Sequence, residues 1–299
     1  DAYLVISKKE NAYITDSRYT EEAKKNLDKD FTIKKFNGSV FKVIADVCLS
    51  LKVKRVGFEE RYLSFAEHKK IKESLNKAVT LIPVYGLIEQ SRQIKTKEEL
   101  EKIKKGVQIT IKAFKFIKDF ISPGKKEIEV AGELERFIRY NGACASSFDI
   151  IVASGPNSSF PHHLTSPRKI KNNEPVLVDM GVDYYGYKSD LTRVFFLGKI
   201  TPVTRSIYDI VRRAKDKAIR KIKPNVFINK IDEAARQYIA QEGYGGFFGH
   251  NLGHGVGLEV HEEPHIRGEE NNSLKPGMVF TIEPAIYLPD KFGIRIEDM

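Results

Sequence analysis

Residues 175–197 read Pro175-Val-Leu-Val-Asp179-Met-Gly-Val-Asp183-Tyr-Tyr-Gly186-Tyr-Lys-Ser-Asp190-Leu-Thr-Arg193-Val-Phe-Phe-Leu197. The apolar run over residues 176–178 predicts a buried strand that carries Asp179 at its end. Residues 184–186 predict a turn, after which a second strand returns and carries Asp190 back toward Asp179. Two carboxylates eleven positions apart (190 − 179) therefore meet across a hairpin. Like charges so placed require either a shared proton or a cation between them.

The composition is that of a soluble, globular chain. At 299 residues, with 41% hydrophobic and 30% charged residues, it is long enough for two domains. It contains no run of about 18 apolar residues and no charged-then-apolar leader, so we expect no membrane partner. Cys48 and Cys144 are too few for a disulfide framework. The expected compartment is the reducing cytoplasm.

The net charge of +10 comes from 50 Lys and Arg against 40 Asp and Glu. A nucleic-acid groove usually gathers such charge on one face, with arginines and aromatic residues interleaved. Here the lysines are spread over predicted helix faces and mixed with glutamates, as in residues 97–102. We therefore interpret the charge as a solvated surface and expect no nucleic-acid partner.

The N-terminal part, residues 1–92, is predicted to be an α/β domain because short apolar runs alternate with amphipathic stretches. Its only histidine, His68, lies among lysines and is expected to be inert. Residues 90–94 are polar and without periodicity, which places the domain boundary there. The strands are predicted at residues 2–6, 12–15, 31–34, 55–58 and 79–84, and the helices at 18–27, 39–51 and 64–75.

The C-terminal part, residues 93–299, is predicted to be an α+β domain. Thr96 and Glu99 match a capping box at the start of a long helix that ends at Ser122-Pro123-Gly124. The order helix, helix, strand, strand then occurs twice, which suggests two related halves facing one another. The remaining elements are helices at 127–140, 201–221 and 229–241, a strand at 148–153, and a loop at 154–163.

Three histidines lie close together in His250-Asn-Leu-Gly-His254-Gly-Val-Gly-Leu-Glu-Val-His261. The glycines beside His254 permit close approach by backbone or by a ligand. A single histidine is more often structural than a ligand. Three within twelve residues, embedded in glycine, favour a binding site.

Two more acids follow apolar stretches, Glu283 in Gly277-Met-Val-Phe-Thr-Ile-Glu283-Pro284 and Glu297 in Gly293-Ile-Arg295-Ile-Glu297-Asp298. Either acid alone could simply cap a neighbouring group. Together with Asp179 and Asp190 they carry four negative charges, which two divalent ions would balance. Oxygen ligands with one imidazole suit Mn, Co, Fe or Zn. Two such ions about 3.5–4 Å apart can share a hydroxide and polarise a carbonyl.

In these motifs the chain resembles the metallopeptidase family with the pita-bread fold, which includes methionine aminopeptidase, aminopeptidase P and Xaa-Pro dipeptidase (prolidase). The resemblance covers residues from about Gln90 onward. Residues 1–92 are similar in layout to the creatinase-type domain of the proline-directed members. Relative to that family the chain begins late, is short of a loop and strand between Ile6 and Thr15, and stops two residues after Glu297.

The resemblance implies a role for each site residue. Asp179 would chelate one metal, Asp190 and Glu297 would bridge both, and His254 and Glu283 would complete the other. Glu283 would also move a proton from the bridging water toward the leaving amine. His250 and His261 would hold the substrate peptide and stabilise its oxyanion, and His162 would lie at the mouth of the pocket. Arg295 would orient Glu297 or meet the substrate carboxylate. Thr192 would support Asp190.

The Arg-Ile-Glu-Asp motif and the extra N-terminal domain resemble the Xaa-Pro-cleaving branch. The implied activity is removal of an N-terminal residue that precedes proline. The resemblance also implies a homodimer with two divalent ions per subunit, with Mn or Co expected in preference to Zn or Fe. Methionine aminopeptidase is one alternative. A metal-free binding module of the same fold is another, but such relatives lose ligands that are all present here.

Overall fold

The structure is a computed structural model that describes residues 2–299. The chain divides into two compact units, Asp1–Leu87 and Ile88–Met299. Among the described residues, no helix combines the length and the apolar character that crossing a bilayer requires.

The first unit contains every strand and helix predicted for it, with ends shifted by no more than two residues. β1 and β2 are antiparallel and β3 joins β2 in parallel, while β4 and β5 form a separate parallel pair. Helices α2 and α3 pack together over a core that includes Ile14, Ile44 and Leu75. The elements are β1 (Ala2–Ile6), β2 (Asn11–Thr15), α1 (Thr20–Asn26), β3 (Phe31–Lys35), α2 (Val40–Ser50), β4 (Arg55–Glu59), α3 (Phe65–Ser74) and β5 (Thr80–Val84).

The second unit holds all of the predicted site residues. Helix α4 (Leu87–Arg92) begins at the last residue of the first unit. The further helices of the second unit are α5 (Lys97–Phe120), α6 (Glu127–Tyr140), α7 (Pro202–Ile219) and α8 (Ile228–Gln241), with 3₁₀ turns η1 (Gly155–Ser159) and η2 (Gly245–Phe247). Its strands are β6 (Ala145–Ser146), β7 (Ile151–Ser154), β8 (Pro175–Met180), β9 (Val182–Tyr184), β10 (Tyr187–Lys188), β11 (Leu191–Phe196), β12 (Gly253–Gly255), β13 (Glu262–Ile266), β14 (Ala285–Leu288) and β15 (Phe292–Arg295).

The predicted hairpin is confirmed. β8 and β11 are antiparallel, with Asp179 opposite Thr192, and β7 pairs with the other edge of β8. Every residue of β8 is buried, as the apolar run requires. β9 and β10 continue the hairpin beyond Gly181. A Cβ at Gly181 would lie 1.6 Å from the carbonyl oxygen of Ser189, so only glycine fits where the two parts of the hairpin meet.

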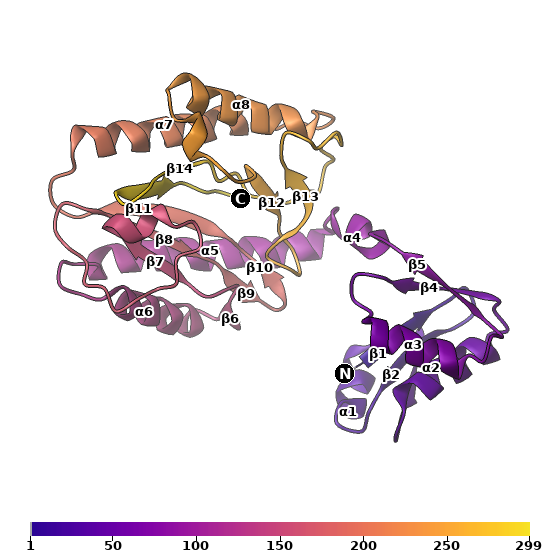
Figure 1. Ribbon diagram of the computed structural model, residues 1–299. Coiled ribbons are helices and arrows are strands. Elements are labelled where there is room, and N and C mark those ends of the chain that lie inside the picture. The colour runs from indigo at the N-terminus through magenta and orange to yellow at the C-terminus, as the bar shows by residue number, and fades with distance from the viewer. Residues whose placement is uncertain (1) are drawn as a thin grey trace. The chain divides into compact units, whose positions relative to one another are not determined.

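The two predicted halves are visible as two helix pairs on opposite sides of the strands. In Figure 1 strands β7, β8, β11 and β14 lie between α5 and α6 on one side and α7 and α8 on the other. Each helix pair closes its own apolar core. The capping box of Thr96 and Glu99 is formed at the start of α5. The N-cap hydroxyl of Thr201 starts α7 by accepting from the amide of Thr204.

The short helix α4 was not predicted, and the polar residues 90–94 begin within it. Two local predictions are wrong. The stretch expected to be a plain loop begins with η1, because Pro156 stands at its first turn and Ser158 and Ser159 donate to nearby carbonyls. The strand expected before Glu283 is instead an extended segment whose residues bridge three different partners, so no continuous ladder forms.

Candidate metal centre

The nine predicted site residues line one cavity of about 800 Å³. The cavity lies between the hairpin, the histidine-rich segment and the C-terminal strands, so residues far apart in sequence meet in it. These nine residues are Asp179 on β8, Asp190 before β11, His254 on β12, Arg295 on β15, Glu283 and Glu297 in extended segments, and His162, His250 and His261 in loops.

Within residues 2–299, three overlapping groups of side chains could each hold a metal ion. They are Asp179, Asp190 and Glu297; His254, Glu283 and Glu297; and Asp190, His254 and His261. Within each group the ligand atoms lie within 4.8 Å of one another. Because Asp190, His254 and Glu297 each occur in two groups, the groups are adjacent and share ligands.

The buried carboxylates have unsatisfied oxygens. Oδ1 of Asp179, Oδ1 of Asp190 and Oε1 of Glu297 are buried and have no hydrogen-bond partner within residues 2–299. A buried polar atom without a partner is costly, and a buried anion more so. Together with a nearby imidazole, these free oxygens form a donor set that suits a divalent cation.

The neighbouring acids repel one another, and this repulsion raises pKa values in the cluster. Burial, and then the neighbouring carboxylates, raise the pKa of Asp190 and of Glu297 well above their ordinary values. Burial raises the pKa of Glu283 to about 8, although Arg295 opposes the shift. The cluster therefore holds protons unless a cation neutralises it.

His254 presents a free lone pair to this cluster. Its Nδ1 lies 3.1 Å from the carbonyl oxygen of Gly255, which can only accept, so Nδ1 carries the hydrogen. Nε2 then faces Oδ2 of Asp190 at 3.6 Å and Oε1 of Glu283 at 3.4 Å. Burial, and then His261, lower the pKa of His254 to about 4. The imidazole is therefore neutral, which is the form that binds a metal.

Arg295 is only 4% exposed and binds groups of the protein itself. Its Nη2 donates to Oδ2 of Asp179 at 2.5 Å, and its Nε donates to Oγ1 of Thr192 at 3.2 Å. Its Nη1 donates to the hydroxyl of Tyr287 at 2.6 Å and to the carbonyl oxygen of Pro161 at 3.3 Å. These bonds engage each guanidinium nitrogen and hold Asp179 in place.

Thr192 supports a different acid from the one predicted. Its hydroxyl donates to Oε2 of Glu297 at 2.7 Å and accepts from Arg295, whereas the sequence suggested a contact with Asp190. The hairpin register places Thr192 opposite Asp179, and the C-terminal segment lies against Thr192, because the amide of Glu297 donates to the Thr192 carbonyl oxygen at 3.2 Å.

His250 and His261, which both line the cavity, differ in how their ring nitrogens are engaged. Nδ1 of His250 donates to the carbonyl oxygen of Asn251 at 2.7 Å, and its Nε2 lies 3.3 Å from the hydroxyl of Tyr287. Both nitrogens of His250 are thus engaged. His261 is open to solvent, and its ring centroid lies 4.2 Å from that of His254. Partial burial, and then His162, lower the pKa of His261.

Several residues that line the cavity were not predicted, among them Tyr287, His163 and His265. The Tyr287 hydroxyl joins Arg295 to His250. Tyr287 lies in an apolar strand, where its hydroxyl gave no signal. His163 directly follows His162 and His265 lies four residues after His261, so their nearness in sequence to predicted site residues could have indicated that they line the cavity.

Comparisons with known proteins agree with this architecture. The model of metallopeptidase family M24 matches residues 101–299, and that of the creatinase/prolidase N-terminal domain matches residues 1–94. The chain is 41% identical over 239 residues to Xaa-Pro dipeptidase of Pyrococcus furiosus, covering 80% of this chain and 68% of that protein.

Two solved structures superpose closely. Xaa-Pro dipeptidase from Bacillus anthracis matches with a TM-score of 0.96 and 40% identity, over 100% of this chain and 83% of that one. X-Pro aminopeptidase from Thermotoga maritima matches with a TM-score of 0.91 and 37% identity, over 99% of this chain and 84% of that one. The predicted creatinase-like domain and pita-bread catalytic domain are confirmed. The chain belongs to metallopeptidase family M24.

Proposed function

We propose that this protein is a hydrolase with two divalent metal ions that removes the N-terminal residue from peptides with proline in the second position. The observation that carries the proposal is the convergence of four acids and a neutral histidine on one cavity, where three buried carboxylate oxygens have no hydrogen-bond partner among the described residues. Relatives named Xaa-Pro dipeptidase and X-Pro aminopeptidase support the substrate class.

We assign the ligands as the resemblance to the metallopeptidase family implies, and the three adjacent groups of side chains support this assignment. Asp179 would hold one ion, Asp190 and Glu297 would bridge both, and His254 and Glu283 would complete the other. Divalent ions held there would supply Lewis acidity, which makes a water nucleophilic near neutral pH and polarises the scissile carbonyl.

The chain's own groups would move the protons. The Glu283 carboxylate would take a proton from the attacking water and pass it to the leaving amine. His261, whose imidazole is open to the cavity, would donate a hydrogen bond to the carbonyl oxygen as it gains charge. We propose that His250 contacts the peptide through its ring, because both of its nitrogens are already engaged. His162 would close the mouth of the pocket.

We propose that Arg295 is a positioning residue and does not meet the substrate carboxylate. Its buried guanidinium is committed to Asp179, Tyr287, Thr192 and the carbonyl of Pro161. Thr192 would hold Glu297 in its bridging orientation. This arrangement preorganises two ligands before any ion binds.

A proline in the second position presents a tertiary amide without an N–H. A site for such a peptide must recognise the ring and the free amine.

We further propose Mn or Co as the working metal, a homodimer, a cytoplasmic location, and a domain boundary between residues 92 and 93. The unpaired state of Cys48 and Cys144 supports the reducing compartment.

The proposal is tested by hydrolysis of Ala-Pro, Ala-Pro-Ala and Met-Ala-Ser by Mn-loaded protein. Cleavage of one or both proline peptides, with Met-Ala-Ser intact, is the expected result, and the ratio of the first two rates gives the length preference. Cleavage of Met-Ala-Ser alone would indicate a methionine aminopeptidase. No cleavage and no bound metal would indicate a binding module.

A further inference from the structure

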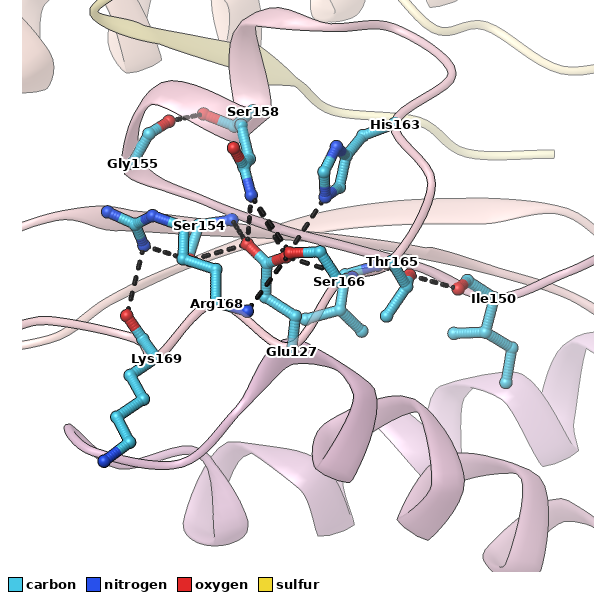
Figure 2. Close-up of polar contacts among 12 residues, drawn as sticks. Glu127, Ile150, Ser154, Gly155, Ser158, His163, Thr165, Ser166, Arg168 and Lys169 are labelled. Carbon is cyan, nitrogen blue, oxygen red and sulfur yellow. Dashed lines mark hydrogen bonds and ion pairs between the residues drawn. The ribbon is translucent and has the colours of Figure 1, made fainter.

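A second polar cluster lies beside the metal centre, outside the set of proposed ligands. Its centre is Glu127, the first residue of α6, whose side chain is fully buried. Figure 2 shows donors converging on this carboxylate from both ends of residues 154–166, the segment that follows β7. We call this segment the wall loop, because its residues 161–165 line the cavity of the metal centre.

Both carboxylate oxygens of Glu127 are used. Oε1 accepts from the amide of Ser154 at 2.8 Å and from its hydroxyl at 2.7 Å. Oε2 accepts from the hydroxyl of Ser166 at 2.5 Å and lies 3.0 Å from Nε2 of His163. The amide nitrogen of Asn157 donates to both oxygens, at 3.0 and 3.1 Å. One buried side chain thus ties the start, middle and end of the wall loop to α6.

Glu127 is an anion in the folded protein. Burial alone would raise its pKa, but hydrogen bonds, chiefly from Ser166 and Ser154, outweigh burial and lower it. Hydrogen bonds to a charged group are about twice as strong as those between neutral groups. The Glu127 cluster is therefore a strong anchor for a loop that has little regular structure of its own.

The opposite side of the wall loop contacts the strand that carries Arg295. The amide of Gly293 on β15 donates to the hydroxyl oxygen of Ser158 at 2.9 Å. The carbonyl oxygen of Pro161 accepts from Nη1 of Arg295. The wall loop therefore lies between Glu127 and the group that holds Asp179.

The adjacent residues His162 and His163 make different contacts. The His163 ring turns to Glu127, as Figure 2 shows. The neighbouring His162 lines the cavity and is near enough to His250 and His261 to lower the pKa of each. Because His162 and His163 are adjacent in the chain, the contact of His163 with Glu127 also restrains the backbone from which His162 reaches the cavity.

We propose that Glu127 and His163 are positioning residues, which hold the wall loop so that His162 and the Pro161 carbonyl form one side of the substrate site. The role of the wall loop in substrate binding rests on the proposed function. The anchoring itself does not, because it consists of contacts within the chain.

The test compares His163→Ala, His163→Gln and Glu127→Gln with the wild type. Glutamine at position 163 keeps an N–H donor near the place of Nε2, so it should rescue the loss caused by alanine. Glu99→Gln is the matched control, since Glu99 also lies in the first turn of a helix and accepts two backbone or hydroxyl donors, far from the wall loop in the chain. Hydrogen exchange of residues 155–165 is measured in each metal-free protein, and kinetics and metal content are measured after Mn loading.

In His163→Ala and Glu127→Gln we expect exchange of residues 155–165 to rise about tenfold. KM for Ala-Pro should rise about fivefold or more, with kcat changed by less than about twofold and metal content unchanged. His163→Gln and Glu99→Gln should stay near the wild type in both readouts. Unchanged exchange in His163→Ala would overturn the proposal, as would a loss of metal without a change in KM.

If the wild type does not cleave proline peptides, the proposed function fails. Hydrogen exchange still decides whether Glu127 and His163 hold the wall loop. Should Glu127→Gln fail to fold, His163→Ala decides alone, because removing one partly exposed ring leaves the other bonds of Glu127 in place.

Discussion

Asp179 and Arg295 lie 116 positions apart and form an ion pair, with Nη2 of Arg295 2.5 Å from Oδ2 of Asp179. Both side chains are nearly inaccessible to solvent. The pair uses one oxygen of Asp179 and leaves the other, Oδ1, without a partner in the described part of the chain. The hairpin and the C-terminal strand are thus joined at the place where a cation is expected.

Arg295→Met should destabilise the metal-free protein. Methionine fills similar space but leaves the buried Asp179 without its counter-charge, and breaking a buried pair costs about 3–5 kcal/mol. Urea unfolding measures the change. Arg212→Met is the matched control, because its partner Asp209 is a surface residue, and its effect should be about 0–1 kcal/mol. Equal stabilities of the two variants would contradict the role given to Arg295.

Thr192→Val should weaken metal binding while leaving the fold intact. Valine has the same shape, but it cannot donate to Oε2 of Glu297 or accept from Arg295. Loss of a group that orients a ligand costs about 10–100-fold in metal affinity or activity. Titration of Mn into the metal-free variant checks this. An unchanged affinity together with unchanged kcat would show that Glu297 needs no such support.

His261→Ala should keep the metals and lose rate. If His261 donates to the developing oxyanion, its removal lowers kcat by about 10²–10³. Elemental analysis of the same preparation separates this outcome from ligand loss. A variant that comes out empty of metal would place His261 among the ligands, as its proximity to Asp190 and His254 allows.

The contribution of Glu127 to the free energy of unfolding should decrease at low pH. Its folded pKa is lowered below the ordinary value of 4.5, so the unfolded state binds the proton more readily. The stabilisation is therefore complete above the unfolded pKa and is lost as pH falls through the folded pKa. The difference in unfolding free energy between the wild type and Glu127→Gln should shrink from pH 7 toward pH 3. A difference that stays constant over that range would show that the carboxylate charge is not what stabilises the loop.

Much of the fold could be predicted because its signals are local. The apolar run before Asp179 and the turn at Tyr184–Gly186 define the hairpin, and the capping box at Thr96 marks the start of α5. Helix α4 and the turn η1 were missed, since both are short and depend on local contacts that periodicity does not record.

The sequence indicated which side chains gather in one cavity, but not how they are connected to one another. Acids and histidines beside apolar or glycine-rich stretches indicated which side chains gather in the cavity. The partners of Thr192 and Arg295, and the bonds from Glu127 to the wall loop, join residues far apart in the sequence. Such contacts follow from strand register and packing, which a single sequence does not reveal.

The central claim is that the four acids and His254 hold two cations. Calorimetric titration of Mn into metal-free protein, with elemental analysis of the loaded sample, tests it most directly. We predict two ions per chain for the wild type, and one or none for Asp190→Asn and for Glu297→Gln. No stoichiometric binding by the wild type, or the same two ions in both variants, would contradict the claim.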